Sequence, residues 1–256
     1  MSLTMLRTLL TAIGTAALFS GCAAPTSSVV GPANADKLRA VKTIAIATPL
    51  NVSYYTTTGA APTVLFPGAG VIANIASGAV SGTLNAGAKS STDEFNKLAV
   101  ESRGGKPPSQ DALDTVKAEL SKSSFSVSEV DLAQDGAPKL KIDGYLPTTT
   151  GDSYRGADAI MVISLQPGYK APGPLNSYRR EVIGSITVFD SASLKPIFRK
   201  GIRYWKTFDE SSYLTYASLK EDLPKAIGAL DKITTEELLG ATKAFVAATH
   251  QARSAQ

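Results

Sequence analysis

The run Asp158-Ala-Ile-Met-Val-Ile-Ser-Leu-Gln166 is almost continuously apolar and carries no charge after its first residue. Strands that are covered on both faces are typically such runs, whereas strands with one wet face alternate apolar and polar residues. Residues 158–166 are therefore predicted to form the central strand of a sheet that has other layers packed on both of its faces.

A long hairpin is predicted next to this strand. Residues 181–189 and residues 197–207 alternate apolar and polar side chains, and a turn is expected between them at residues 190–196. Three further strands are predicted upstream, over residues 41–48, 125–132 and 139–146.

Helices are predicted before and after these strands. Ser91-Thr-Asp-Glu94 has the form of a capping box and predicts a helix through Leu98 that stops near Gly104. Pro107-Pro108-Ser109 predicts the start of a second helix, which carries apolar residues at helical spacing. Further helices are also expected at the end of the chain, where they would cover a face of the sheet.

Two helices are predicted in the last 34 residues, one from about Leu223 and one opened by Thr234-x-x-Glu237. The second would present one buried face, made of Leu238, Thr242, Phe245, Val246 and Thr249. Together the elements predict a single α/β (α+β) domain over residues 41–256, with a mixed sheet of about five strands flanked by helices. A hydrophobic content of 43% suits such a globular chain.

The first 22 residues indicate export. Arg7 precedes an apolar run over residues 9–19, which is shorter than the roughly 20 residues needed to span a bilayer but fits a secretory signal. The run ends in Leu18-Phe19-Ser20-Gly21-Cys22, which resembles the signal of bacterial lipoproteins. The resemblance implies that residues 1–21 are removed and that acyl chains such as palmitate anchor the thiol of Cys22. An ordinary cleavable signal with an incidental Cys22 is the alternative.

Residues 22–40 are predicted to be a tether, since they are rich in small residues and proline and show no helical or strand period. Ala23 follows Cys22, where the inner-membrane retention signal of the resembled family places Asp. The resemblance therefore implies the outer membrane, with the domain on its periplasmic face. Cys22 is the single cysteine, so a lipid there leaves no thiol for a disulfide, a zinc site or a nucleophile.

A second resemblance concerns the domain itself. Residues 41–48, the hairpin and the final amphipathic helix are similar to a group of envelope lipoproteins that includes the curli secretion channel subunit. The hairpin residues that carry it are Phe189, Asp190, Ser193, Ile197, Phe198 and Gly201. The core of these lipoproteins resembles the amino-terminal domain of TolB. The resemblance implies that fold, and a role as an accessory in envelope assembly, secretion or export.

Residues 51–88 contain no charged residue and are dominated by Gly, Ala, Ser and branched aliphatics after Pro67. Small residues four apart begin at Gly70, Gly78 and Gly82, a spacing that lets a helix approach another backbone closely. These glycines are predicted to form an association face toward a second copy or toward lipid. A mobile surface loop, or a helix folded onto the protein's own sheet, is the alternative.

Catalytic and cofactor motifs are weak. Gly68-Ala-Gly70-Val-Ile-Ala73 lacks the acidic residue that a dinucleotide site needs about 20 positions later, and residues 82–90 are one residue too long for a P-loop. His250 is the single histidine and lies near the terminus, so neither a general base nor a metal site is expected, and no cofactor is predicted. A cluster of aromatic residues predicts either core at a strand end or an exposed platform: Tyr204, Trp205, Tyr213 and Tyr216.

The charge balance does not suggest nucleic acid as a partner. Removing Arg7 from the 26 Lys and Arg leaves 25 against 22 Asp and Glu, a net charge of only +3. The sequence predicts a non-enzymatic lipoprotein that is held at the membrane by Cys22 and acts on envelope proteins, polymers or a second copy of itself. A periplasmic hydrolase or a ligand-binding lipoprotein is the alternative.

Overall fold

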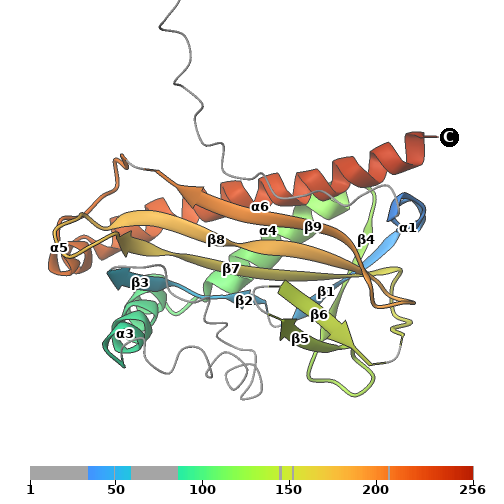
Figure 1. The fold of residues 1–256 in the computed structure, drawn as a ribbon, viewed down its shortest axis with the longest axis horizontal. Coiled ribbons are helices and arrows are strands. Elements are labelled where there is room, and N and C mark those ends of the chain that lie inside the picture. Colours follow the sequence, from blue (N-terminus) through green and yellow to red (C-terminus); the bar gives the residue numbers. More distant parts are fainter. Residues whose placement is uncertain are drawn as a thin grey trace, which may run out of the picture.

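The structure, a computed structural model, describes residues 34–48, 50–58, 86–143, 146–151, 153–206 and 208–255. Its helices are α1 (Ala35–Ala40), α3 (Ala86–Ser102), α4 (Pro108–Lys122), α5 (Tyr216–Glu221) and α6 (Leu223–Ser254). Its strands are β1 (Thr43–Thr48), β2 (Asn51–Val52), β3 (Tyr55–Thr58), β4 (Ser126–Asp131), β5 (Lys139–Asp143), β6 (Leu146–Thr150), β7 (Ala159–Ala171), β8 (Arg179–Asp190) and β9 (Pro196–Trp205). Figure 1 shows the long helix α6 running along the sheet.

The strands form a mixed sheet in the order β4-β1-β7-β8-β9. β1 pairs in parallel with β4 and β7, while β8 is antiparallel to both β7 and β9. β2 and β3 continue along the same edge of β7, also in parallel, and β5 and β6 form a separate hairpin. The predicted fold class, an α/β domain with a mixed sheet of about five strands flanked by helices, is confirmed.

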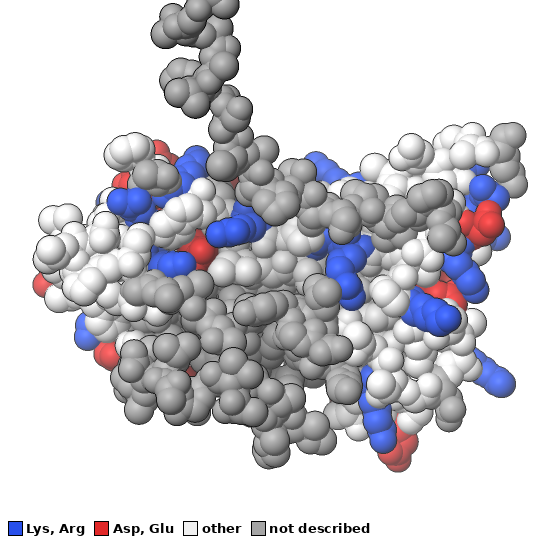
Figure 2. All heavy atoms as spheres, in the orientation of Figure 1, with Lys and Arg blue, Asp and Glu red and all other residues white. Residues whose placement is uncertain are grey.

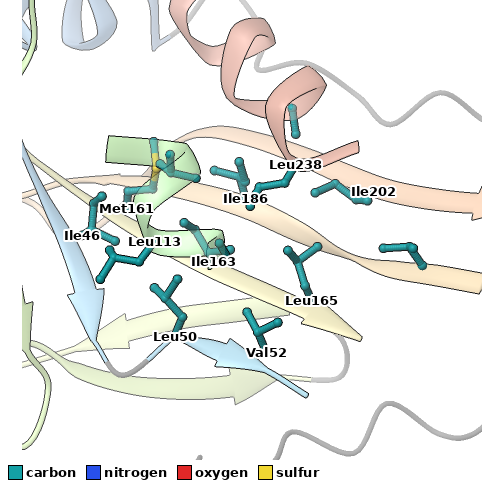
Figure 3. Packing of buried hydrophobic residues seen from close by; sticks show 14 of the residues in the cluster. Ile46, Leu50, Val52, Leu113, Met161, Ile163, Leu165, Ile186, Ile202 and Leu238 are labelled. Carbon is teal, nitrogen blue, oxygen red and sulfur yellow. The ribbon is translucent and has the colours of Figure 1, made fainter. Parts of the chain in front are cut away.

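The main core lies between the sheet and the helices α4 and α6. Figure 3 shows Met161, Ile163 and Ile186 of the sheet packed together with Leu113 of α4 and Leu238 of α6. Each of these side chains is at most 8% exposed. Burial of a side chain of this size contributes about 1.5–3 kcal/mol, so this layer holds the two helices on the sheet.

The opposite face of β7 faces a second, smaller core. Ile160 and Val162 pack there with Val130 of β4, Phe189 of β8 and Leu194 of the β8–β9 turn. Because successive residues of a strand point to opposite faces, a strand between two cores must be apolar at every position. The prediction that residues 158–166 form the central strand is confirmed, and β7 extends beyond them to Ala171.

The C-terminal residues form one helix of 32 residues rather than the two that the sequence predicts. The Thr234 hydroxyl donates to the carbonyl oxygen of Leu230 at 2.7 Å inside the helix, so Thr234 does not cap a new one. A threonine can satisfy its hydroxyl in this way without breaking the helix. The predicted buried face is otherwise correct, since Leu238, Thr242 and Phe245 are at most 1% exposed.

The helix predicted from Ser91 begins five residues earlier, at Ala86. The Thr92 hydroxyl, expected near the start of the helix, instead donates to the carbonyl oxygen of Thr56 in β3 at 2.9 Å. The capping-box prediction is wrong, because Ser91 lies inside α3 and Glu94 accepts a hydrogen bond from the Lys220 Nζ of α5 at 3.2 Å. The helix predicted from Pro108 is confirmed as α4.

The end of the predicted tether belongs to the folded body. Ala35–Ala40 form α1, in which Leu38 is 5% exposed and the Arg39 Nε donates to the carbonyl oxygen of Ala252 at 2.8 Å. One large apolar residue in six gives no period, which is why the sequence does not predict this helix. Likewise the single strand predicted over residues 139–146 is instead β5 and the first residue of β6 in a hairpin, in which Asp143 pairs with Leu146.

Candidate contact site at the tip of the sheet

The candidate site is the end of the sheet where β7 connects to β8, next to α5 in Figure 1. Here the chain that follows β9 folds back onto β8. Tyr178 and Tyr213 exchange two backbone hydrogen bonds of 2.7 and 3.0 Å. Asp209 accepts hydrogen bonds from the backbone N–H of Arg180 at 3.1 Å and from its Nε at 2.9 Å. These contacts fix the segment after β9 against the sheet.

The ion pair between Arg180 and Asp209 is buried, with side-chain exposures of 6% and 0%. Burial opposes the charged form of Asp209, but the hydrogen bonds from Arg180 and from the backbone N–H of Ser211 outweigh it and hold the pKa of Asp209 below its usual value. The arginine also donates to the carbonyl oxygen of Ala229 in α6 at 3.2 Å. The pair therefore joins the tip to both the sheet and the long helix.

Three large hydrophobic side chains project from this end. Leu175 is 101% exposed, Phe208 is 90% exposed and Leu214 is 83% exposed. Leu214 adjoins Tyr213, Phe208 adjoins Asp209, and Leu175 is three residues from Tyr178. The pairing of these neighbours therefore places all three at the same end of the sheet. We call these three residues the apolar tip. Exposed apolar groups gathered at one place mark interaction surfaces, whereas single ones are common.

A layer of tyrosines lies beneath the apolar tip. The ring centroids of Tyr169 and Tyr213 are 5.6 Å apart, and those of Tyr178 and Tyr216 are 6.2 Å apart. Burial, followed by the hydrogen bond and charge of Asp222, raises the pKa of Tyr213 to about 12. Tyr213 therefore stays neutral and acts as a packing group at physiological pH.

The structure divides the aromatic cluster predicted from the sequence. Tyr204 is core, at 8% exposed, whereas Tyr213 and Tyr216 are partly buried against the same core. Trp205 is half-buried on the opposite face of β9, where the Lys170 Nζ lies 5.6 Å from its ring centroid. The core alternative thus applies to Tyr204, whereas its neighbour Trp205 is more exposed, because successive residues of β9 point to opposite faces of the sheet.

A polar cluster that the sequence does not predict is centred on Arg103. Its guanidinium donates to the carboxylates of Asp111 and Asp231 and to the Tyr54 hydroxyl, and its Nε donates to the carbonyl oxygen of Lys106 at 3.0 Å. Burial raises the pKa of Asp231, and burial together with Asp231 raises the pKa of Tyr54. Tyr54 and Asp231 are 177 residues apart, so no local spacing could reveal the cluster. Each member has a partner, as in a network that joins α3, α4 and α6.

A second buried carboxylate lies closer to the apolar tip. Glu181 is 2% exposed and accepts a hydrogen bond from the Tyr55 hydroxyl, while the Lys170 Nζ lies 3.8 Å from its Oε1. Burial and the charge of Glu181 raise the pKa of Tyr55. These contacts link side chains of β3, β7 and β8 on this face of the sheet.

The predicted site residues Cys22, Gly70, Gly78 and Gly82 lie outside the described residues. The structure does place the flanks of the uncharged segment. Thr58, the last described residue before it, has its Oγ1 2.6 Å from the Tyr178 hydroxyl oxygen. α3 runs antiparallel to β3, with Thr92 bonded to Thr56 and Asn96 bonded to Tyr54, so its start also lies toward the tip.

Other predicted features can be checked in the described part of the chain. His250 is exposed near the C-terminal end of α6. Within the described ranges no group of three or more His, Cys, Asp or Glu is arranged to hold a metal ion. A helix with the length and apolar character required to cross a membrane is likewise not found there.

The chain was compared with known proteins. No protein-family model matches it, and a search of curated proteins returns no significant match. The candidate site therefore stands on its own geometry.

Proposed function

We propose that this protein is a non-enzymatic outer-membrane lipoprotein that faces the periplasm and serves as an accessory in envelope assembly, secretion or export. A lipid on Cys22 would attach it to the membrane. It would act through contacts with envelope proteins or polymers, or with a second copy of itself, made by the apolar tip. The observation that carries the proposal is the exposure of Leu175, Phe208 and Leu214 at one end of the body.

The position of the apolar tip relative to the tether supports this role. α1, where the tether joins the body, is bonded to Ala252 near the C-terminal end of α6. The tip is tied to the other end of α6, because the Tyr213 hydroxyl donates to Asp222 at 3.1 Å. A helix of 32 residues is about 48 Å long. A chain anchored through the tether therefore carries its apolar tip far from the point of attachment.

The similarity to the curli secretion channel subunit and its relatives supports the same role. The mixed α/β sheet is of the class that this similarity implies. A protein that recruits partners at a membrane needs an anchor and a contact surface rather than a catalytic centre.

The anchor is tested by labelling cells with a radioactive fatty acid and fractionating the envelope. We expect the wild-type protein to be labelled and to fractionate with the outer membrane, and Cys22→Ser to lose the label. A wild-type protein that carries no lipid and fractionates as a free periplasmic protein would overturn the proposal.

The contact role is tested by cross-linking in cells. We expect the triple variant Leu175→Ser, Phe208→Ser, Leu214→Ser to lose the cross-linked species of the wild type while the circular dichroism spectrum of the purified protein stays unchanged. His250→Ala, at the opposite end of α6, is the control and should retain them. A single polar substitution that abolishes function in a folded protein would instead favour a hydrolase.

A further inference from the structure

Four basic side chains lie beside the apolar tip. Lys170 of β7 stands directly opposite Arg179 of β8 in the strand register. Arg203 is exposed on β9, and Lys206 follows the same strand, with its Nζ 5.6 Å from the ring centroid of Tyr204, on the side of the strand opposite to Trp205. Like charges that face each other across two strands destabilise a sheet. Glu181 lies 3.8 Å from Lys170 and offsets part of this repulsion, whereas Arg179 forms no ion pair with a described residue and can bind an external anion.

Carboxylates near these four residues are few in the described part of the chain. Glu181 is 3.8 Å from Lys170, but it is buried and also accepts the hydrogen bond from Tyr55. The exposed Glu210 lies 3.8 Å from Arg180, which Asp209 already pairs. Arg179, Arg203 and Lys206 form no ion pair with a described residue. We call Lys170, Arg179, Arg203 and Lys206 the basic patch.

The segments that carry the apolar tip have their own character. Residues 171–178 and residues 211–217, which carry Leu175 and Leu214, contain no charged side chain, whereas Phe208 is close in sequence to Lys206, Asp209 and Glu210. Leu175 and Leu214 project from these two segments, and Tyr178, Tyr213 and Tyr216 lie behind. Figure 2 shows the same end of the body as mainly uncharged, with both basic and acidic side chains on the adjacent face. Proteins that bind a bilayer surface show this same order. Apolar side chains lie outermost, tyrosines lie behind them, and cationic side chains lie beside them.

We propose that the apolar tip and the basic patch bind the surface of a bilayer that contains anionic lipids. Leu175, Phe208 and Leu214 enter the acyl region, the tyrosines lie at the level of the headgroups, and the basic patch contacts the lipid phosphates. Side chains that stand almost fully in solvent need a partner that adapts to their shape, and a fluid bilayer does so without a preformed pocket. This inference rests on the proposed function, because it names the partner of the same contact surface.

The experiment uses the intact protein with vesicles of phosphatidylcholine, with or without phosphatidylglycerol, made from brominated or ordinary lipids. Trp205 is the single tryptophan of the chain and lies beside the basic patch. Brominated acyl chains quench tryptophan on contact, so the emission of Trp205 reports whether this end of the body touches the bilayer. We expect loss of emission in brominated vesicles that contain phosphatidylglycerol, and little loss in those that lack it.

Variants test whether the apolar tip and the basic patch make the contact with the bilayer. The triple variant Leu175→Ser, Phe208→Ser, Leu214→Ser should keep the emission that the wild type loses. Lys206→Glu should weaken the quenching, whereas Lys195→Glu, exposed at the other end of β9, should leave it unchanged. Full quenching of the triple variant, or equal quenching in vesicles with and without anionic lipid, would overturn the proposal.

Flotation of the same vesicles separates this inference from the proposed function. Protein that floats while Trp205 stays unquenched would be anchored without a contact at the tip, and the inference fails alone. Protein without lipid on Cys22 that is still quenched would retain the contact while the lipoprotein assignment fails. The wild-type protein could instead show no quenching and form a dimer that the triple serine variant disrupts. That result would identify a second copy of the chain as the partner and overturn the proposal of bilayer binding.

Discussion

Arg103 shows how much one side chain can connect. It is 10% exposed and bridges Asp111 of α4 and Asp231 of α6, which are 43% and 32% exposed. Replacing Arg103 by Met leaves Asp231 and Tyr54 without their cation, so we expect the free energy of unfolding to fall by about 3 kcal/mol. This value is at the lower end of the range for a broken buried ion pair, because Asp111 and Asp231 are both partly exposed to water. Urea denaturation measures the change.

Lys97→Met is the matched control, since it removes a cation from an exposed pair with Glu101. Exposed pairs on a helix contribute about 0.3–0.5 kcal/mol. Equal losses in the Arg103 and Lys97 variants would mean that the buried network does not stabilise the fold.

Asp209 and Glu237 are expected to change the free energy of unfolding with pH in opposite directions. Burial opposes the charge of both, but Arg180 lowers the pKa of Asp209, whereas burial and the neighbouring Glu236 raise the pKa of Glu237. The stabilisation from Asp209 is complete above the ordinary Asp pKa of about 3.9 and is lost as pH falls through its lower folded-state pKa. Glu237 has the reverse sign, because stability falls as pH rises from about 4.3 through its raised folded-state pKa.

We therefore expect Asp209→Asn to lower the free energy of unfolding at neutral pH and to weaken its loss in acid. Glu237→Gln should raise the free energy of unfolding at neutral pH. Urea denaturation over a series of pH values checks both, and changes of the same sign at neutral pH would contradict the assignment.

At the scale of elements, two threonines with similar sequence signals behave differently. Thr215 caps α5, since its Oγ1 accepts from the Ser218 N–H at 3.0 Å, whereas Thr234 lies inside α6 and donates to Leu230. Thr215→Val should lower the free energy of unfolding by about 1 kcal/mol, as expected when a cap is lost. Thr234→Val should change it by less than about 0.5 kcal/mol, because the Leu230 carbonyl keeps its helical hydrogen bond. A larger loss for Thr234→Val would indicate a helix boundary there.

This pair also explains which elements the sequence can predict. The strands β7, β8 and β9 are predicted because the pattern of apolar residues shows which face of the sheet each residue occupies. Burial requires this pattern over 10 to 13 residues in each strand, which is long enough to recognise. Capping motifs are local, so the sequence cannot distinguish Thr215, which caps α5, from Ser91, which lies inside α3. β2 and β3, of two and four residues, are too short to show a period.

The candidate site was only partly predictable for the same reason. Tyr213 and Tyr216 draw attention as aromatics, but the exposure of Leu175 and Phe208 depends on where the chain turns in three dimensions. A leucine followed by Asn176 and a phenylalanine followed by Asp209 could equally be buried. The pairing of Tyr178 with Tyr213 and of Arg180 with Asp209 brings these segments to the same end of the sheet.

For the whole molecule, α6 sets the distance between the two ends that matter for the proposed function. If Cys22 carries the lipid, as proposed, about 12 residues separate it from α1, and a chain of that length spans about 40 Å at most. The tip therefore reaches the anchoring membrane only when the long axis of the body lies along it. Upright, the body presents the tip to the periplasm.

The uncharged segment adds the last prediction at this scale. Its flanks, Thr58 and the start of α3, both lie toward the tip, so two copies that associate through it would meet at that end. If Gly78 and Gly82 form an association face, Gly78→Leu and Gly82→Leu should reduce cross-linked oligomers while leaving the free energy of unfolding of the monomer unchanged, because the leucine side chain blocks close approach only between chains.

Gly240→Leu is the matched control for these two variants. Gly240 is exposed on α6, and a side chain built there meets no atom within 4 Å, so the substitution should leave oligomers intact. Cross-linking in membranes followed by urea denaturation of the purified protein gives both readouts. If Gly78→Leu and Gly82→Leu unfold the monomer, the segment packs on its own body; if they leave the oligomers as they are, association occurs elsewhere.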